Sequence, residues 1–175
     1  MAPQPVAADL SDLVGHWTLD PAATSVVFHT KAMFGLVKVK GRFTATEGSG
    51  SVGEDGAVTG TLLLDAASVD TGNKKRDAHL RGTDFFDVGT FPTITFDATR
   101  ATATGAGAVS IEGTLTINGQ TRPITVAGRG EAAPDGAVTV DAEADIDRRE
   151  WGVSWAKMGA KVDNHVVVRA RFTKA

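Results

Sequence analysis

The sequence of 175 residues contains no cysteine and no tyrosine, and no long apolar run. Without cysteine, disulfides and thiolate chemistry are both excluded. No segment approaches the roughly 20 consecutive apolar residues of a membrane-spanning helix, so we expect no transmembrane segment. The net charge is only −3 and basic residues are scattered along the sequence, which argues against a nucleic-acid partner.

The start of the chain also lacks the features of a secretory signal. Residues 1–16 contain Pro3, Pro5, Asp9 and Asp12, which interrupt any apolar stretch, and no basic segment precedes them. We therefore expect a cytoplasmic protein. Residues 1–15 are interpreted as an N-terminal arm, with a short helix near residues 9–14, and residues 16–175 as one β-barrel domain.

Several segments alternate apolar and polar residues with period two, which predicts strands with one apolar face. The clearest covers residues 109–117, and Asn118-Gly119 after it favours a tight hairpin. Residues 47–56 are rich in glycine and serine and are interpreted as a solvated loop, and residues 73–80 as a short helix. The other strands are expected at residues 17–20, 25–30, 37–45, 58–66, 93–99, 121–126, 138–146 and 164–172.

This pattern indicates an all-β fold: a closed antiparallel eight-stranded barrel with a short helix near the middle of the chain. A barrel of this size is either filled by side chains or holds one small ligand. Small inward residues favour the second outcome, because they leave apolar space inside the barrel. They are Gly41, Ala45, Gly60, Ala66, Ala98, Gly113, Ala127, Ala142, Ala144 and Ala170.

Many short motifs are shared with one family. The most specific cover residues 67–73 (ASVDTGN), 76–80 (RDAHL) and 84–88 (DFFDV). Further matches lie at residues 17–21, 33–35, 40–43, 92–96, 113–119, 122–124, 147–148, 151–152 and 162–168. With these motifs the chain resembles the YceI-like family of polyisoprenoid-binding proteins over residues 17–172.

The resemblance implies a lipocalin-like barrel with a deep apolar pocket for a long isoprenoid chain, such as a polyprenyl phosphate or a quinone tail. It also implies a homodimer, and it calls for no cofactor. We therefore expect a carrier or reservoir for the lipid, in lipid transport, and not an enzyme.

Large apolar residues near strand ends are predicted to line the barrel lumen, although ordinary core packing is the alternative for each of them. They are Phe28, Met33, Phe34, Leu80, Phe85, Phe86, Phe96, Leu115, Trp151, Trp155 and Met158. Basic residues nearby are weaker candidates for contacts to a lipid head group. They are Lys31, Arg76, His79, Arg81 and Lys157. For Arg76 and Asp77 a structural role is favoured, in which Asp77 and Asp84 pair with the arginines and clamp the helix onto the barrel rim.

Two further functions stay open at this point. One is an enzyme that acts on a captured lipid, with His79 or Asp77 transferring a proton. The other is an interaction module whose barrel is filled. The four histidines have no spacing typical of a metal site, and no nucleophile motif or phosphate-binding loop is present, so no catalytic or metal-binding residue is predicted.

Overall fold

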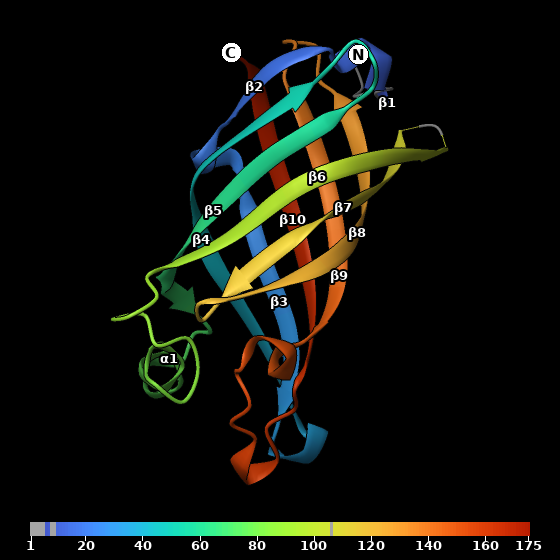
Figure 1. The fold of residues 1–175 in the computed structure, drawn as a ribbon. Helices are drawn as coiled ribbons and strands as arrows, with labels where there is room; N and C mark the ends of the chain where they lie inside the picture. The colour runs from blue at the N-terminus through green and yellow to red at the C-terminus, as the bar shows by residue number, and fades with distance from the viewer. Residues whose placement is uncertain (1–5, 8–9, 106) are drawn as a thin grey trace, which may run out of the picture.

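The computed structural model describes residues 6–7, 10–105 and 107–175, without the side chains of Val6, Ala7 and Met158. More than half of this chain is strand, and the strands form one antiparallel barrel (Figure 1). The elements are β1 Val6–Ala7, η1 Leu10–Leu13, β2 Gly15–Leu19, η2 Pro21–Ala23, β3 Ser25–Ala32, η3 Met33–Gly35, β4 Val37–Val52, β5 Val58–Asp70, α1 Lys74–Arg81, β6 Thr93–Gly105, β7 Ala108–Ile117, β8 Gln120–Ala132, β9 Val138–Asp147, η4 Arg148–Trp151, η5 Lys157–Gly159 and β10 Asp163–Lys174.

The barrel closes because β9 pairs with β8 on one side and with β10 on the other. From β4 to β8, each strand pairs with the next in the chain. Between β4 and β10 lie both β2 and β3, which follow one another along a single strand position. This arrangement confirms the predicted closed eight-stranded barrel, in which every strand position is hydrogen-bonded on both sides.

The 3₁₀ turn η2 interrupts this shared strand position between β2 and β3. Two hydrogen bonds bridge the interruption: the Asp20 amide donates to the Arg171 carbonyl at 2.8 Å, and the Arg171 amide donates to Thr24 Oγ1 at 3.2 Å. The barrel therefore stays continuous across a short break in one of its strands.

Two local predictions, the hairpin turn at Asn118-Gly119 and the short helix, are confirmed. Asn118 and Gly119 have φ values of 54° and 72°, which a tight hairpin turn of this type requires, and they join β7 to β8. The predicted helix is α1. The Asn73 side chain accepts a hydrogen bond from the Arg76 amide at 3.0 Å and so caps its first turn.

The predicted solvated loop at residues 47–56 is wrong for its first six residues. β4 continues to Val52, and the chain turns only at residues 53–57. Glycine and serine are weak strand formers, but Gly50 pairs here with Trp17 on β2 and with Gly60 on β5. Hydrogen bonding on both sides outweighs the low intrinsic propensity of these residues.

The barrel interior is filled at the end where α1 lies. Phe43 packs between Phe28 and Phe86. Its ring centroid lies 5.5 Å from that of Phe28 and 5.3 Å from that of Phe86. Trp151 is buried beside them in the same core, and its indole N–H donates to the Leu115 carbonyl at 2.7 Å. These aromatic side chains close this half of the barrel.

The outer face of β9 and β10 carries ion pairs. His165 lies between two carboxylates, with Nδ1 at 2.8 Å from Asp145 Oδ1 and Nε2 at 3.5 Å from Glu143 Oε2. The hydrogen bond to Asp145 is the main reason why the pKa of His165 is raised above 6.5. Asp141 lies 3.9 Å from Arg169 on the same face. The acidic residues of β9 thus face basic partners across the sheet.

The Phe28 ring leaves no room for a side chain at Gly41. A Cβ atom there would lie 2.2 Å from Phe28 Cζ, and the ring is buried against Phe43. We expect Gly41→Ala to lower the free energy of unfolding by about 1–3 kcal/mol, as overpacking does, measured by urea denaturation. In the matched variant Gly50→Ala the new Cβ has no neighbour closer than 3.9 Å, so its stability should stay close to that of the parent. Equal stability of the two variants would contradict this packing.

The His165 ion pairs predict a pH dependence with a definite sign. A raised pKa in the folded state stabilises the protein below pH 6.5, and this contribution is lost as the pH rises through the folded-state pKa. Asp145→Asn should lower the pKa of His165, measured by NMR titration, and should reduce stability more at acidic than at alkaline pH. Asp141→Asn, which leaves the partners of His165 in place, is the control. An unchanged His165 titration in Asp145→Asn would contradict the assignment.

Candidate functional site

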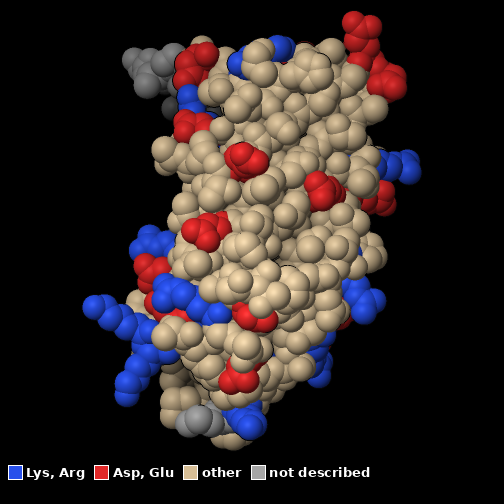
Figure 2. Space-filling model, turned by 60° about the vertical axis from the view of Figure 1, so that its left-hand side comes forward, with Lys and Arg blue, Asp and Glu red and all other residues tan. Residues whose placement is uncertain are grey.

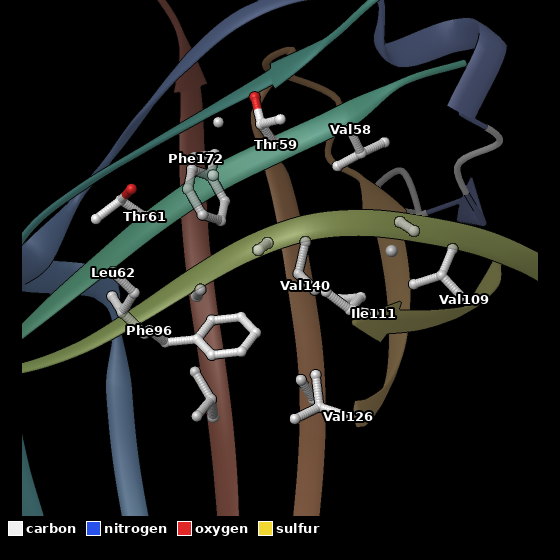
Figure 3. A pocket seen from close by; sticks show the side chains of 18 of the residues that line it. Val58, Thr59, Thr61, Leu62, Phe96, Val109, Ile111, Val126, Val140 and Phe172 are labelled. Atoms are coloured by element: carbon white, nitrogen blue, oxygen red, sulfur yellow. The ribbon is translucent and has the colours of Figure 1, made fainter. Parts of the chain in front are cut away.

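An apolar cavity of about 270 Å³ lies in the half of the barrel opposite α1. It is bounded by strands β2 to β10 and by η1. Figure 3 shows side chains of β6 to β10 directed into the same space, among them Phe96, Ile111, Val126, Val140 and Phe172. Because these residues come from five strands, the site depends on closure of the barrel.

A row of small residues leaves this half of the barrel hollow. Gly50, Gly60, Ala98 and Gly113 are successive partners across β4, β5, β6 and β7, and all of them but Gly113 border the cavity. No side chain in this row is larger than a methyl group, so almost no side-chain volume projects from this part of the barrel wall into the interior. Gly113 is also required by the backbone, since a Cβ atom there would lie 2.2 Å from the Asp97 carbonyl oxygen.

The cavity has almost no polar character. Most of its lining side chains are Val, Leu, Ile, Ala and Phe. The one charged residue among those described in the lining is Glu143, and its carboxylate is exposed on the outer face beside His165. In the described part of the chain, no buried side-chain nitrogen or oxygen lacks a hydrogen-bond partner. An apolar space of this kind stays dry and favours apolar guests.

The segment before β2 forms part of the cavity wall. Leu10 and Leu13 of η1 line the cavity, and Trp17 beside them donates its indole N–H to the Leu13 carbonyl at 2.8 Å. The Lys174 ammonium donates to the Val14 carbonyl at 2.8 Å and lies 5.0 Å from the Trp17 ring centroid. Residues that the sequence assigned to the N-terminal arm are thus fixed at this end of the barrel. The remainder of the arm, apart from the β1 backbone, falls outside the described residues.

Of the predicted lumen residues, Phe96 and Leu115 line the cavity. Phe28, Phe86 and Trp151 lie in the filled half of the barrel. Bulky side chains near strand ends close the barrel here, in accordance with the core-packing alternative. None of the three is among the residues that line the cavity, and their assignment as ligand contacts stays a prediction.

The other predicted lumen residues lie beyond the filled end. Phe85 and Trp155 pack around His79, with ring centroids 5.0 and 4.6 Å from the imidazole. Leu80 is half-buried on α1, and Met33 and Phe34 are exposed in the turn between β3 and β4. The Met158 side chain falls outside the described residues. The structure does not bring this set together around one space.

The predicted head-group residues lie away from the cavity, and three of them have structural partners. Arg76 donates to the hydroxyl and the carbonyl of Thr71, and Arg81 donates to the carbonyls of Ala67 and Val69 on β5. His79 Nε2 lies 2.8 Å from Asp84 Oδ2.

Buried Asp77 accepts hydrogen bonds from the amide and the hydroxyl of Thr71. These contacts hold α1 on the barrel, as the clamp interpretation expects. The partners differ from the predicted ones: Arg76 and Arg81 bind Thr71 and backbone carbonyls, and the described chain shows no ion pair between either arginine and Asp77 or Asp84. Lys31 and Lys157 are exposed near the end of the barrel that lies farthest from the cavity.

Most of the cavity lining consists of aliphatic residues that the sequence marked only as inward strand positions. Examples are Val109, Ile111, Val138, Val140 and Val168. The period-two pattern was a sufficient signal for their inward orientation. Ala127 is the exception in that pattern, since it is exposed and Gly128 takes the inward position on β8. The pattern did not show which inward positions face empty space.

Among the residues placed by the structure, no helix has the length and apolar character to cross a membrane. Within the same residues, no group of three or more histidine and acidic side chains is arranged to hold a metal ion.

Comparison with known proteins agrees with the fold. The structure of BcnA from Burkholderia cenocepacia superposes with a TM-score of 0.77 at 24% identity, over 89% of this chain and 99% of that one. A polyisoprenoid binding domain from Saccharophagus degradans, implicated in plant cell wall breakdown, gives a TM-score of 0.72 at 18% identity, over 91% and 98% of the two chains. At these identities the likeness concerns the fold alone.

Sequence comparison identifies the family. A UPF0312 protein of Vibrio vulnificus is 32% identical over 126 residues, which are 70% of this chain and 65% of that protein. The matched region thus spans about two thirds of the relative. The model of the YceI-like domain matches residues 17–173, almost the whole barrel. The chain therefore belongs to the YceI-like family.

Proposed function

We propose that the cavity binds the apolar chain of an isoprenoid lipid, such as a polyprenyl phosphate or a quinone tail, and that the protein acts as a carrier or reservoir for it. The observation that carries this proposal is the dry aliphatic space enclosed by the small-residue row on β4 to β7. Membership of the YceI-like family and the fold shared with a polyisoprenoid binding domain support the same ligand class.

The size of the cavity limits how much of a lipid it can hold. A cavity of ~150 Å³ holds one benzene molecule. At about 270 Å³, the cavity here accommodates on the order of ten carbons by the same scale, or about two isoprene units. Burial of ten carbons contributes ~8 kcal/mol before the costs of ordering, so affinities in the micromolar range or weaker are expected. The rest of a longer chain would lie outside the cavity.

The apolar lining also bears on specificity. No charged side chain of the described lining points into the cavity, so recognition depends on the hydrocarbon chain and not on the head group. An apolar cavity discriminates poorly between chains that differ by one or two methylenes. A polyprenol and its phosphate should therefore bind with similar affinity. Head-group contacts from Lys31, Arg76, His79, Arg81 and Lys157 remain predictions from the sequence, and the distance of these residues from the cavity gives them no support.

An enzymatic role finds no support in this site. His79 and Asp77, the two candidates for proton transfer, lie on α1 and contact Asp84 and Thr71. Neither lines the cavity. We propose that the protein does not change the lipid chemically, and that mass spectrometry of lipid incubated with the protein will recover it unaltered. The predicted cytoplasmic location and the predicted homodimer stay predictions, which fractionation of cells and light scattering would test.

Filling part of the cavity should weaken lipid binding. Gly50→Leu adds four carbons beside Trp17, where a Cβ atom would have no neighbour closer than 3.9 Å. Loss of room for about four methylenes corresponds to ~3 kcal/mol, so we expect affinity for a short polyprenol to fall on the order of a hundredfold, measured by isothermal titration calorimetry. The thermal midpoint should not fall.

The matched control is Gly89→Leu, at an exposed turn position without neighbours within 4 Å, which should bind as the parent does. Organic extraction of purified parent protein, followed by mass spectrometry, gives a second measurement. If no lipid is recovered and no polyprenol is taken up, or if Gly50→Leu binds as tightly as the parent, the proposal fails.

A further inference from the structure

The turn between β3 and β4 exposes a cluster of large apolar side chains, which we call the apolar tip: Met33, Phe34, Leu36 and Val37. Their exposed fractions are 56%, 77%, 85% and 37%, and Val167 is the one other large hydrophobic residue exposed to this degree among those described. Single exposed apolar residues are ordinary, but a contiguous cluster marks an interaction site. The apolar tip lies at the lower end of the barrel in Figure 1, at the end opposite β1.

The backbone holds these side chains outward in an unfavourable conformation. Met33 and Phe34 have φ values of 50° and 59°, and Gly35 follows at 88°. Left-handed φ values are uncommon for bulky residues, and two in succession are maintained only by the surrounding structure.

The support comes from the loop that contains η5. Gly159 packs so closely on Phe34 that a Cβ atom would lie 2.5 Å from the Phe34 nitrogen. The Lys161 amide donates to the Lys31 carbonyl at 3.0 Å, and Arg148 in turn donates to the Lys161 carbonyl at 3.1 Å. The apolar tip is therefore presented by a fixed pair of loops.

Lysines surround the apolar tip. Residues 31–40 and 157–161 contain five lysines and no aspartate or glutamate, although the whole chain carries a net charge of −3. All five lysines are exposed, and within the described chain none of them forms an ion pair. The five are Lys31, Lys38, Lys40, Lys157 and Lys161. In Figure 2, lysine and arginine side chains gather over the lower part of the molecule, whereas its upper part carries mainly acidic ones.

We propose that the apolar tip docks the protein on a membrane surface rich in anionic phospholipid. In this arrangement Phe34 and Leu36 enter the boundary between head groups and acyl chains, while the lysines contact phosphate groups. Lysine suits this position because its long apolar stem can lie along the membrane interface and its ammonium can reach the phosphates. The proposal concerns the surface of the protein and is independent of what the cavity binds.

Two observations favour a membrane over a protein partner. A stable protein interface buries about 1,000 Å² or more in total, whereas the apolar tip is a projecting turn of four side chains. Protein interfaces are also depleted in lysine, whereas five lysines border this tip. An anionic lipid surface accepts both the small apolar insertion and the surrounding positive charge.

Vesicle flotation tests the proposal. The parent protein should bind vesicles of equal parts phosphatidylglycerol and phosphatidylcholine, bind weakly to pure phosphatidylcholine, and dissociate as salt rises, because salt screens the lysines. The double variant Phe34→Ser/Leu36→Ser should lose binding at least about tenfold, since two inserted side chains are removed. Lys38→Ser/Lys161→Ser should lose about fivefold for each lysine.

Matched controls lie elsewhere on the surface. Val167→Ser replaces an exposed apolar residue on the barrel wall, and Arg100→Ser removes a positive charge on β6, next to the cavity-lining Ala101; both should bind vesicles as the parent does. All replaced side chains are exposed, so circular dichroism should show unchanged folding. In Phe34→Trp, the new tryptophan should show a blue-shifted emission on anionic vesicles and be quenched by brominated lipid.

Three results would overturn the proposal: no binding of the parent to anionic vesicles at low salt, binding that neither double variant reduces, or tryptophan emission in Phe34→Trp that vesicles leave unchanged. A parent dimer that Phe34→Ser/Leu36→Ser converts to a monomer, without vesicle binding by either, would assign the apolar tip to a second copy of this chain. Loss of polyprenol binding in Gly50→Leu, by contrast, should leave vesicle flotation unaffected, so the two proposals fail independently.

Discussion

Closure of the barrel through β9 is the constraint on which the other features depend. Because β9 is hydrogen-bonded to β8 and to β10, the circumference is fixed by the backbone and cannot shrink to fit smaller side chains. Replacing large inward residues with small ones therefore creates space inside the barrel. The row formed by Gly50, Gly60, Ala98 and Gly113 uses this property, and the cavity lies beside it.

The circumference is fixed in both halves of the barrel, but the size of the inward side chains differs between them. Toward α1, the rings of Phe28, Phe43 and Phe86 pack across the interior and leave it full. Toward η1, glycines and short aliphatic residues leave it empty. The filled half supplies stability that the hollow half lacks, since an empty cavity forfeits packing contacts. The protein can thus hold an apolar space without losing its fold.

The sequence was sufficient for the presence of the barrel strands, though not for the second half of β4, and also for α1, for the Asn118-Gly119 turn and for the family, because each rests on local pattern or motif. It was insufficient for the site. An inward residue such as Val140 or Phe28 can face either the empty cavity or the packed core. Which of the two occurs depends on the residues opposite it across the barrel, and the local alternation of the sequence carries no information about them. The lysines next to the apolar tip also appear scattered in the sequence. They come from residues 31–40 and 157–161, and these two segments come together only when the barrel has formed.

The interruption between β2 and β3 forms a seam in the barrel wall, where few backbone hydrogen bonds join neighbouring strands. At residues 20–24 only two hydrogen bonds, both with Arg171, continue the pairing of this strand position with β10. Val26 and Trp17, on either side of this seam, both border the cavity. Expansion of the lumen around a bulkier guest is therefore eased at this position, and local opening of the wall is expected there.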